Sequence, residues 1–323
     1  MNQTSKKQAI DIKVGSVIVG KWHKNRYTVK KQLGQGAIGS VYLCEHNGKP
    51  QALKISDKSS SVTMEVNVLK TLQKVQGSRL GPSLLDVDDW VDMRGNRYSF
   101  YVMEYLKGIT LPTFIQRSGK EWLGILMMQL LTDLESLHQA GWVFGDLKTD
   151  NLLVVSSPAR IRWIDVGGTT QIGRSIKEYT EFYDRGYWKM GSRRAEPSYD
   201  LFALAMIMLQ IYHPNRFERG TNPQKTLLLK LSKTSELDIY KPVIQKAIQG
   251  HYLSSDQMKR DLNTLIMKNQ HNTAPQASSH ARGNVVTRQS RQVSNQPKSH
   301  TFLESMGISV AVLLFYLFYL VVQ

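Results

Sequence analysis

Three glycines in one short turn, Gly34, Gly36 and Gly39, constrain the fold of the first third of the chain most strongly. The turn lies between two runs, 27–33 and 41–46, that have the alternating pattern of β-strands. A glycine-rich turn of the dinucleotide-binding class opens a helix, whereas here the chain continues as a strand. The pattern therefore predicts a glycine-rich hairpin, whose backbone amides can lie close to phosphate oxygens.

A lysine and a glutamate follow this hairpin at a suggestive spacing. A turn at Asn47-Gly48 leads into a third strand-like run that contains Lys54, and Glu65 follows eleven residues later in a helical window over 61–76. A lysine on the strand beside such a hairpin can hold phosphate oxygens, and Glu65 is positioned to pair with it. Residues 24–105 are thus predicted to form a β-rich unit with one helix.

The central part of the chain carries a second constellation. Asp146, Lys148 and Asn151 follow one another in an Asp-x-Lys-x-x-Asn pattern, and Asp165 begins an Asp-Val-Gly sequence fourteen residues after Asn151. Residues 110–268 otherwise have mainly helical periodicity. The ordered set of glycine-rich hairpin, strand lysine, helix glutamate and these two motifs resembles the protein kinases, in particular the bacterial Hanks-type (eukaryotic-like) serine/threonine protein kinases.

This resemblance implies an α+β fold with two lobes. A small β-rich N-lobe would occupy residues 24–105, and a larger helical C-lobe would occupy residues 106–268. The cleft between the lobes would bind ATP and Mg²⁺. The same resemblance implies that the residues which line the nucleotide come from the hairpin, the sheet and the lobe junction, namely Gly34, Gly36, Gly39, Val41, Ala52, Glu104, Leu106 and Leu153.

The resemblance also implies a division of labour in phosphoryl transfer. Lys54, held by Glu65, would contact the α- and β-phosphates, and Asn151 and Asp165 would be the ligands of Mg²⁺. Such a reaction depends mostly on positioning and on neutralising negative charge, so these groups are expected to surround one site.

Two further catalytic residues and two structural ones complete the implied site. Asp146 would orient the substrate hydroxyl and accept its proton, while Lys148 would neutralise the phosphate in transfer. Two residues have implied structural roles: Thr180 would brace Asp146 and Lys148, and Asp200 would support the catalytic loop from below.

The sequence departs from the family at two places. Phe144 and Gly145 stand where the family has His-Arg before the aspartate, so a switch that reads a phosphorylated activation loop with that arginine cannot operate here. The expected Ala-Pro-Glu is also absent, because Asp184 follows the Thr-x-x-Tyr of residues 180–183. Substrate docking therefore lacks its usual element.

Several side chains near these motifs admit more than one role. Thr169, Thr170 and Ser175 lie between Asp165 and the Thr-x-x-Tyr and are candidate sites of autophosphorylation. His138, at the end of a helix predicted over 120–140, is interpreted as a helix C-terminal cation or a buried hydrogen-bonding residue rather than a general base. Cys44 is expected to be a small buried apolar residue, and a lone cysteine excludes an intrachain disulfide.

The two ends of the chain have different compositions. Residues 1–23 form a basic N-terminal extension, and residues 269–305 form a basic polar linker with no acidic residue before Glu304. Residues 306–322 are uncharged and mostly apolar, except for the polar Ser309, and predict a single-pass transmembrane tail anchor. The segment is shorter than the usual hydrocarbon core, but a thin or locally thinned bilayer would accommodate it. A buried C-terminal helix is the alternative. With basic residues before the anchor, the kinase part is expected on the cytoplasmic face of the cell membrane.

The charge balance indicates polyanionic partners. Lys and Arg number 42 against 26 Asp and Glu, a net charge of +16. The basic linker is consistent with binding DNA, with binding anionic lipid, or with simple solvation. The kinases of spore-forming bacilli that join a basic linker to a terminal membrane segment, a group connected with sporulation, are regarded as DNA-responsive. We therefore hypothesise that polyanion binding or membrane clustering promotes trans-autophosphorylation in a homodimer.

Three functions remain open at this point. The first is a membrane-anchored kinase that transfers the γ-phosphate of ATP to serine and threonine hydroxyls of proteins, including its own. The second is a catalytically weak, membrane-tethered scaffold, which the two departures favour. The third is a kinase of a small molecule or lipid.

Overall fold

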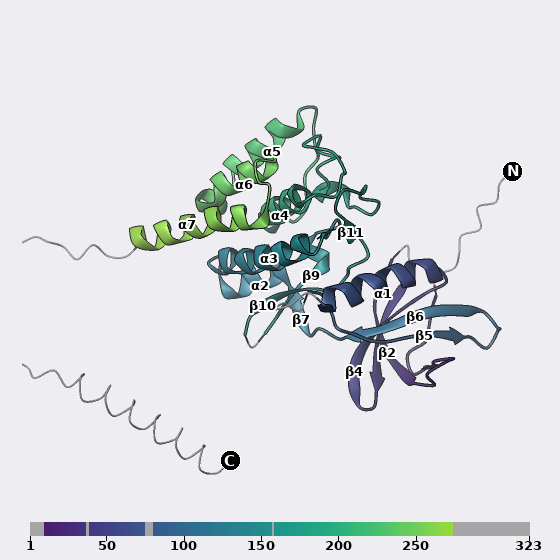
Figure 1. Cartoon of the computed structure of the whole chain (residues 1–323). Helices are drawn as coiled ribbons and strands as arrows, with labels where there is room; N and C mark the ends of the chain where they lie inside the picture. The colour runs from purple at the N-terminus through teal and green to yellow at the C-terminus, as the bar shows by residue number, and fades with distance from the viewer. Residues whose placement is uncertain (1–9, 37–38, 75–79, 157, 274–323) are drawn as a thin grey trace, which may run out of the picture. The chain divides into compact units, whose positions relative to one another are not determined.

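The computed structural model describes residues 10–36, 39–74, 80–156 and 158–273. Within this part of the chain, strands β1 to β6 and helix α1 (Ser59–Lys74) gather in one lobe, and the later, shorter strands gather with α2 to α7 in the other (Figure 1). The predicted two-lobed α+β architecture is confirmed. The lobes meet at the end of β6 (Arg97–Glu104), close to the boundary that the sequence indicated.

The N-lobe is built on an antiparallel sheet with the strand order β1-β2-β3-β4-β6-β5. Apart from β6, its strands are β1 (Val17–Val19), β2 (Arg26–Gln35), β3 (Ser40–His46), β4 (Lys49–Ser56) and β5 (Leu84–Val91). Residues of β3 alternate between the core and the surface, as the period of a half-buried strand requires. The buried Tyr42 and Cys44 of β3 share a small core with Ile12 and Ile18. Helix α1 packs across β4, β5 and β6 and belongs to a separate core.

Two turns in this sheet depend on their residue types. Asn47 and Gly48 both have positive φ, 50° and 73°, which a two-residue hairpin needs to match the strand twist. Gly39 approaches β4 so closely that a Cβ there would lie 2.3 Å from the carbonyl oxygen of Ile55. The hairpin prediction at Asn47-Gly48 is confirmed, and Gly39 is explained by its contact with the neighbouring strand.

Residues 10–23, which the sequence analysis set apart as an extension, lie against the N-lobe sheet. Ile12 and Ile18 are buried, and Ile18 belongs to β1, which pairs with β2. The backbone N–H of Ile12 donates to Tyr42 Oη at 3.1 Å. A run of only three strand residues gives little periodicity, so this addition to the sheet is hard to detect from sequence. Cys44 lies in the same small core, and burial raises the pKa of its thiol to about 12.

The C-lobe is mainly helical. Its helices are α2 (Leu111–Ser118), α3 (Trp122–Gln139), α4 (Pro197–Tyr212), α5 (Pro223–Ser232), α6 (Lys241–Ile248) and α7 (Ser255–Thr273), with 3-10 turns η1 (Thr149–Asn151), η2 (Glu181–Tyr183) and η3 (Ser235–Tyr240). Short strands carry the loops between them: β7 (Gly108–Thr110), β8 (Trp142–Val143), β9 (Leu152–Val155), β10 (Arg160–Trp163) and β11 (Thr170–Gln171). The predicted helix over 120–140 corresponds to α3.

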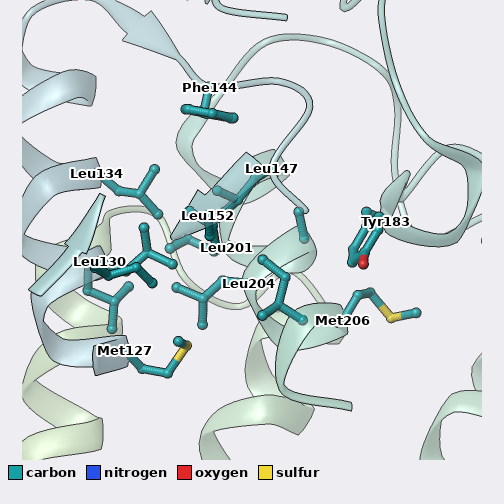
Figure 2. Packing of buried hydrophobic residues seen from close by; sticks show 14 of the residues in the cluster. Met127, Leu130, Leu134, Phe144, Leu147, Leu152, Tyr183, Leu201, Leu204 and Met206 are labelled. Atoms are coloured by element: carbon teal, nitrogen blue, oxygen red, sulfur yellow. The ribbon is translucent and has the colours of Figure 1, made fainter. Parts of the chain in front are cut away.

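The core of this lobe lies directly beneath the loop over 144–151. Side chains of α3 and α4, including Leu130, Leu134, Leu201 and Leu204, lie beside Leu147 of the loop in one cluster (Figure 2). Nearly all of α4 is buried, which explains why its sequence is apolar on every side. The loop therefore rests on a close-packed support.

No helix in the described part of the chain is both long and apolar enough to span a membrane. The transmembrane segment predicted over 306–322 and most of the predicted linker over 269–305 lie outside the described residues. Helix α7 continues to Thr273, so it includes the first residues that were assigned to the linker.

Candidate active site

Lys54, Glu65 and Asp165 come from three elements and meet at one point. Lys54 is on β4, Glu65 on α1, and Asp165 follows β10. The Nζ atom of Lys54 lies 2.7 Å from Glu65 Oε2 and 3.5 Å from Asp165 Oδ1. The helix and the strand therefore hold the lysine between two carboxylates, as the sequence predicted for Glu65.

The charges of this group are buried to different extents. The side chains of Lys54 and Glu65 are 9% and 3% exposed, whereas that of Asp165 is 48% exposed. Burial disfavours the charge of Lys54, but Asp165 and Glu65 outweigh it and raise the pKa of the ammonium group. Tyr101 Oη also donates to Glu65 Oε2 at 2.6 Å. Lys54 and Glu65 thus form a fixed ion pair, while Asp165 retains access to solvent.

The loop over 144–151 positions a second charged group. Lys148 Nζ donates to Asp146 Oδ2 and, at 3.2 Å, to Thr180 Oγ1. Thr180 Oγ1 donates in turn to Asp146 Oδ1 at 3.0 Å. Asn151 Nδ2 donates to the carbonyl oxygen of Asp146 at 2.9 Å. Four residues that the sequence singled out therefore form one hydrogen-bonded network.

Asp200 of α4 supports this loop from the C-lobe core. Its Oδ2 accepts from the backbone N–H of Phe144 at 2.7 Å, and its Oδ1 accepts from that of Gly145 at 3.0 Å. His138 Nε2 lies 2.9 Å from Asp200 Oδ2, and His138 Nδ1 lies 3.0 Å from the hydroxyl of Ser255. Because all three side chains are buried, the interpretation of His138 as a buried hydrogen-bonding residue is confirmed.

A cleft of about 320 Å³ opens between the lobes beside these groups. It is lined by residues that the sequence assigned to contact with the nucleotide or with Mg²⁺, namely Gly34, Val41, Ala52, Lys54, Glu104, Leu106, Asn151, Leu153 and Asp165. Gly36 and Gly39 are not among the lining residues; Gly36 donates its backbone N–H to the carbonyl oxygen of Gly39 at 2.9 Å and closes the turn.

The structure adds residues to the cleft that the sequence analysis missed. Leu33, Pro82 and Ile164 also line it, and they belong to no motif with a fixed spacing. Glu104 directs its carboxylate toward Arg162, whose Nη2 lies 3.1 Å away. Burial opposes the charge of Glu104, but hydrogen bonds from Ser83 and from Arg162 lower its pKa. Glu104 therefore helps to fix the lobe junction through its side chain.

The segment that replaces Ala-Pro-Glu is built around two ion pairs. Asp184 is buried, accepts from Tyr199 Oη at 2.9 Å and pairs with Arg193 at 2.7 Å. The guanidinium of Arg185 lies 2.5 Å from Glu196 and also donates to the hydroxyl of Ser198 at 2.7 Å. Sequence patterns gave no signal for this network, because its members are charged residues without a regular spacing.

The three candidate autophosphorylation sites differ in environment. The hydroxyl of Thr169 is buried and has no hydrogen-bond partner within the described residues. Thr170 lies on β11 and donates to the carbonyl oxygen of Gly168 at 3.0 Å. Ser175 is exposed and forms an antiparallel bridge with Arg194.

Comparison with known proteins agrees with this geometry. The family described as the protein kinase domain matches residues 27–281. The serine/threonine-protein kinase YabT of Bacillus subtilis (strain 168) is 51% identical over 263 residues, which cover 81% of this chain and 78% of that protein. The sporulation protein kinase mde3 of Schizosaccharomyces pombe (strain 972 / ATCC 24843) is 29% identical over 62% of this chain and 39% of its own length.

A solved structure shows the same fold. The structure of vaccinia related kinase 3 matches with a TM-score of 0.57 and 16% sequence identity, over 81% of this chain and 93% of that chain. At this identity the likeness concerns the fold alone. The family match and the identity to YabT, taken with the cleft and its charged network, show that the chain belongs to the protein kinase family.

Proposed function

We propose that this protein kinase transfers the γ-phosphate of ATP to serine and threonine hydroxyls of proteins. One observation carries the proposal: the Lys54–Glu65 ion pair at 2.7 Å is intact at the cleft that Asn151 and Asp165 line. In phosphoryl transfer this pair must be in place, because it holds the phosphates in position. The 51% identity to a serine/threonine-protein kinase supports the class of acceptor.

The residues present fit a site for Mg²⁺ and ATP. Asn151 donates its amide nitrogen to Asp146, which leaves its amide oxygen as an acceptor, and the half-exposed carboxylate of Asp165 lines the cleft. An amide oxygen and a carboxylate are the hard oxygen ligands that Mg²⁺ prefers. We assign both as metal ligands; the chemistry that a bound Mg²⁺ supplies is neutralisation of charge on the phosphate oxygens.

The catalytic roles follow from the second network. Asp146 is held by Lys148 and Thr180, so its carboxylate has a fixed orientation in which it can accept a hydrogen bond and then the proton of the substrate hydroxyl. Lys148 lies beside this carboxylate with its ammonium group available to the transferring phosphate. Thr180 and Asp200 are positioning residues, since Thr180 donates to the Asp146 carboxylate and Asp200 accepts from the loop backbone at Phe144.

Phosphate incorporation from labelled Mg-ATP tests this assignment. The full-length protein in detergent is compared with Asp146→Asn and with Asp150→Asn as a matched control, because Asp150 lies in the same loop but pairs only weakly, at 3.6 Å, with Arg216. We expect Asp146→Asn to lose about 10²–10³-fold in rate while Asp150→Asn stays near wild type.

The other outcomes favour the alternative functions. ATP binding without transfer in the wild type would favour the scaffold. Transfer to a small molecule or lipid, with none to protein, would favour the third function.

We also propose that the chain is anchored in the cell membrane by residues 306–322, with the kinase lobes on the cytoplasmic side. The uncharged tail and the basic residues before it support this arrangement. Flotation of the full-length protein with lipid vesicles tests it, with a variant truncated after residue 302 as the control. Flotation of both proteins alike would contradict anchoring by the tail.

The basic linker, residues 269–305, carries the last proposal, that DNA binding promotes trans-autophosphorylation in a homodimer. Its excess of Lys and Arg supports attraction to phosphate groups, and such attraction weakens as salt rises. The rate of autophosphorylation is measured with single- or double-stranded DNA and with anionic vesicles, at two salt concentrations. Stimulation by vesicles but not DNA would assign the linker to lipid, and no stimulation by either would contradict the hypothesis.

A further inference from the structure

The three candidate acceptors for autophosphorylation are not equally accessible. The hydroxyl of Thr169 is buried, and that of Thr170 is partly buried and bonded to the backbone. Ser175 is exposed. Because phosphoryl transfer requires the hydroxyl to enter another active site, Ser175 is the most accessible acceptor of the three.

Ser175 lies directly opposite a basic residue. It forms an antiparallel bridge with Arg194, framed by two backbone hydrogen bonds, Ile176 N–H to the carbonyl oxygen of Arg193 at 2.8 Å and Ala195 N–H to that of Arg174 at 2.7 Å. This arrangement makes Ser175 and Arg194 a non-hydrogen-bonded pair, the type in which the two side chains lie closest on the same face of the ladder.

The guanidinium of Arg194 has no ion-pair partner within the described ranges, unlike its neighbours. Arg193 pairs with Asp184 at 2.7 Å, and Arg185 pairs with Glu196 at 2.5 Å. Arg194 also interacts electrostatically with Glu196, but that carboxylate already accepts the hydrogen bond from Arg185. Arg194 is therefore an exposed cation whose opposite residue across the bridge is a serine.

We infer that Ser175 is a phosphorylation site and that Arg194 binds the phosphate, in place of the arginine that the family carries where this chain has Gly145. This inference rests on the proposed kinase function. A phosphoserine carries about −1.5 to −2 charges and three acceptor oxygens, which suits an exposed guanidinium opposite it. The phosphate would then tie the segment over 173–176 to the segment over 193–195 more tightly.

The link to the active site is short. Thr180, which donates to Asp146, lies five residues after Ser175 along the same segment. Fixing the segment at Ser175 limits the positions that Thr180 can take and so favours the arrangement of Asp146 and Lys148 described above. Phosphorylation of Ser175 is thus expected to raise the rate of transfer to other proteins.

The modification itself is ordinary phosphoryl transfer. The bond between the γ-phosphorus and the oxygen that bridges it to the β-phosphate breaks, and a bond from the γ-phosphorus to Ser175 Oγ forms. The hydroxyl proton passes to the Asp146 carboxylate of the copy that acts as the enzyme, and ADP leaves with the electron pair of the broken bond.

The first experiment maps the modified residue. Full-length wild-type protein is incubated with Mg-ATP and with the Asp146→Asn variant as acceptor, and phosphopeptides from that variant are quantified by mass spectrometry. We expect more phosphate on Ser175 than on Thr169 and Thr170 together. Phosphate on other hydroxyls but not on Ser175 would overturn the inference, whereas no phosphate on any residue would contradict autophosphorylation itself.

The second experiment does not need autophosphorylation, because phosphoserine is introduced at position 175 during protein synthesis. The second pKa of the phosphate, near 6 in a free phosphoserine, is followed by ³¹P NMR in an otherwise wild-type chain and in Arg194→Ala. Arg174→Ala is the matched control, because Arg174 is equally exposed but, as the neighbour of Ser175 on an extended segment, alternates to the other face.

We expect Arg194 to lower the phosphate pKa by about half a unit, and the Arg194→Ala variant to lose that shift while Arg174→Ala keeps it. Transfer to a basic protein substrate should rise roughly tenfold with phosphoserine, and only in chains that retain Arg194. An equal phosphate pKa in both variants, or an equal rise in both, would overturn the role of Arg194.

Discussion

The nucleotide side of the cleft keeps the charged residues of the protein kinase family, whereas the segment over 184–196 does not keep the family's sequence. On the nucleotide side, Lys54, Glu65 and Asp165 stand at the family's spacings and meet at 2.7 and 3.5 Å. In the segment, Ala-Pro-Glu is gone, and the ion pairs of Asp184 and Arg185 hold the chain instead. We attribute the difference to the proposed nucleotide site, where phosphate charge requires particular charged residues, whereas the segment over 184–196 faces no such requirement.

The segment over 184–196 does not require particular residue types at particular positions. It must satisfy its buried polar groups and fix the activation segment, and several networks can do this. Here Asp184 binds two backbone N–H groups, those of Gly186 and Tyr187, together with Arg193. Different sets of polar residues can form such a network, whereas the proposed phosphate contact requires a cation at the position of Lys54.

The largest effect is expected on the nucleotide side. Lys54→Met should lower the rate of phosphate transfer by about 10²–10³-fold, because it removes the charge that we assign to phosphate contact and leaves Glu65 buried without its partner. The control is Lys49→Met at the exposed start of the same strand. Steady-state rates with Mg-ATP measure both, and near-wild-type activity of Lys54→Met would remove the basis of the comparison.

In the segment over 184–196, substitutions are expected to lower mainly the stability of the fold. Arg185→Leu should lower the free energy of unfolding by about 2–3 kcal/mol, because the buried guanidinium bonds to Glu196, Ser198 and the backbone. Urea unfolding measures the change, with the exposed Arg174→Leu as control. If both variants unfold at the same urea concentration, the segment does not depend on this network.

A smaller effect is expected where the family's arginine is missing. Gly145 has a φ of 81°, and a Cβ there would lie 2.4 Å from the carbonyl oxygen of Gly168. Gly141 has a φ of 87° with open space around it. Gly141→Ala should therefore cost about 1 kcal/mol and Gly145→Ala about 2 kcal/mol, which thermal unfolding can separate.

The close approach of Gly145 to Gly168 also predicts what happens when the family's arginine is introduced at position 145. Gly145→Arg places its Cβ against Gly168, so it should lower activity rather than restore a phosphate switch. A gain of activity in this variant would show that the backbone of the loop can relax to the family's conformation.

The smallest effect is expected at Glu178, which connects the two regions. Glu178 and Glu65 both lie close to Gly167: a Cβ built on Gly167 would be 3.5 Å from Glu178 Oε2 and 3.5 Å from Glu65 Oε1. The activation segment therefore places an additional carboxylate near the Lys54–Glu65 ion pair. Burial, and then Glu65 and Asp165, raise the pKa of Glu178. Glu178→Gln should lower the KM for Mg-ATP by about threefold at neutral pH, because a repelling charge is lost.

The raised pKa of Glu178 also predicts a pH dependence of stability. The folded chain binds this proton at higher pH than the unfolded chain, so the free energy of unfolding falls as pH rises from about 4.3 through the folded-state pKa. Glu178→Gln should flatten this part of the curve, and the exposed Glu181→Gln should not. Identical curves for the two variants would contradict the shift.

The parts of the site that sequence patterns predicted share a property. Lys54, Asp146, Asn151 and Asp165 lie in short motifs whose spacing is set by a hairpin, a loop or a turn. The structure brings Lys54, Asn151 and Asp165 to one cleft, and Asn151 donates to the backbone of Asp146. Residues that no spacing constrains, such as Arg162 at the lobe junction or Arg185 in the segment over 184–196, came only with the structure. Their partners lie far away in the sequence or in an irregular loop.

The sequence by itself indicated a β-rich unit over 24–105 and a mainly helical part over 110–268, because strand and helix periods are local properties. The two-lobed fold and the expected roles of the charged residues came from the resemblance of its ordered motifs to the protein kinases. Only the tertiary structure decided the environment of each hydroxyl in the activation segment. Burial of Thr169, exposure of Ser175 and the position of Arg194 opposite Ser175 depend on how residues 173–176 pair with residues 193–195. Which residues pair across two strands depends on tertiary packing, and local sequence patterns do not predict it.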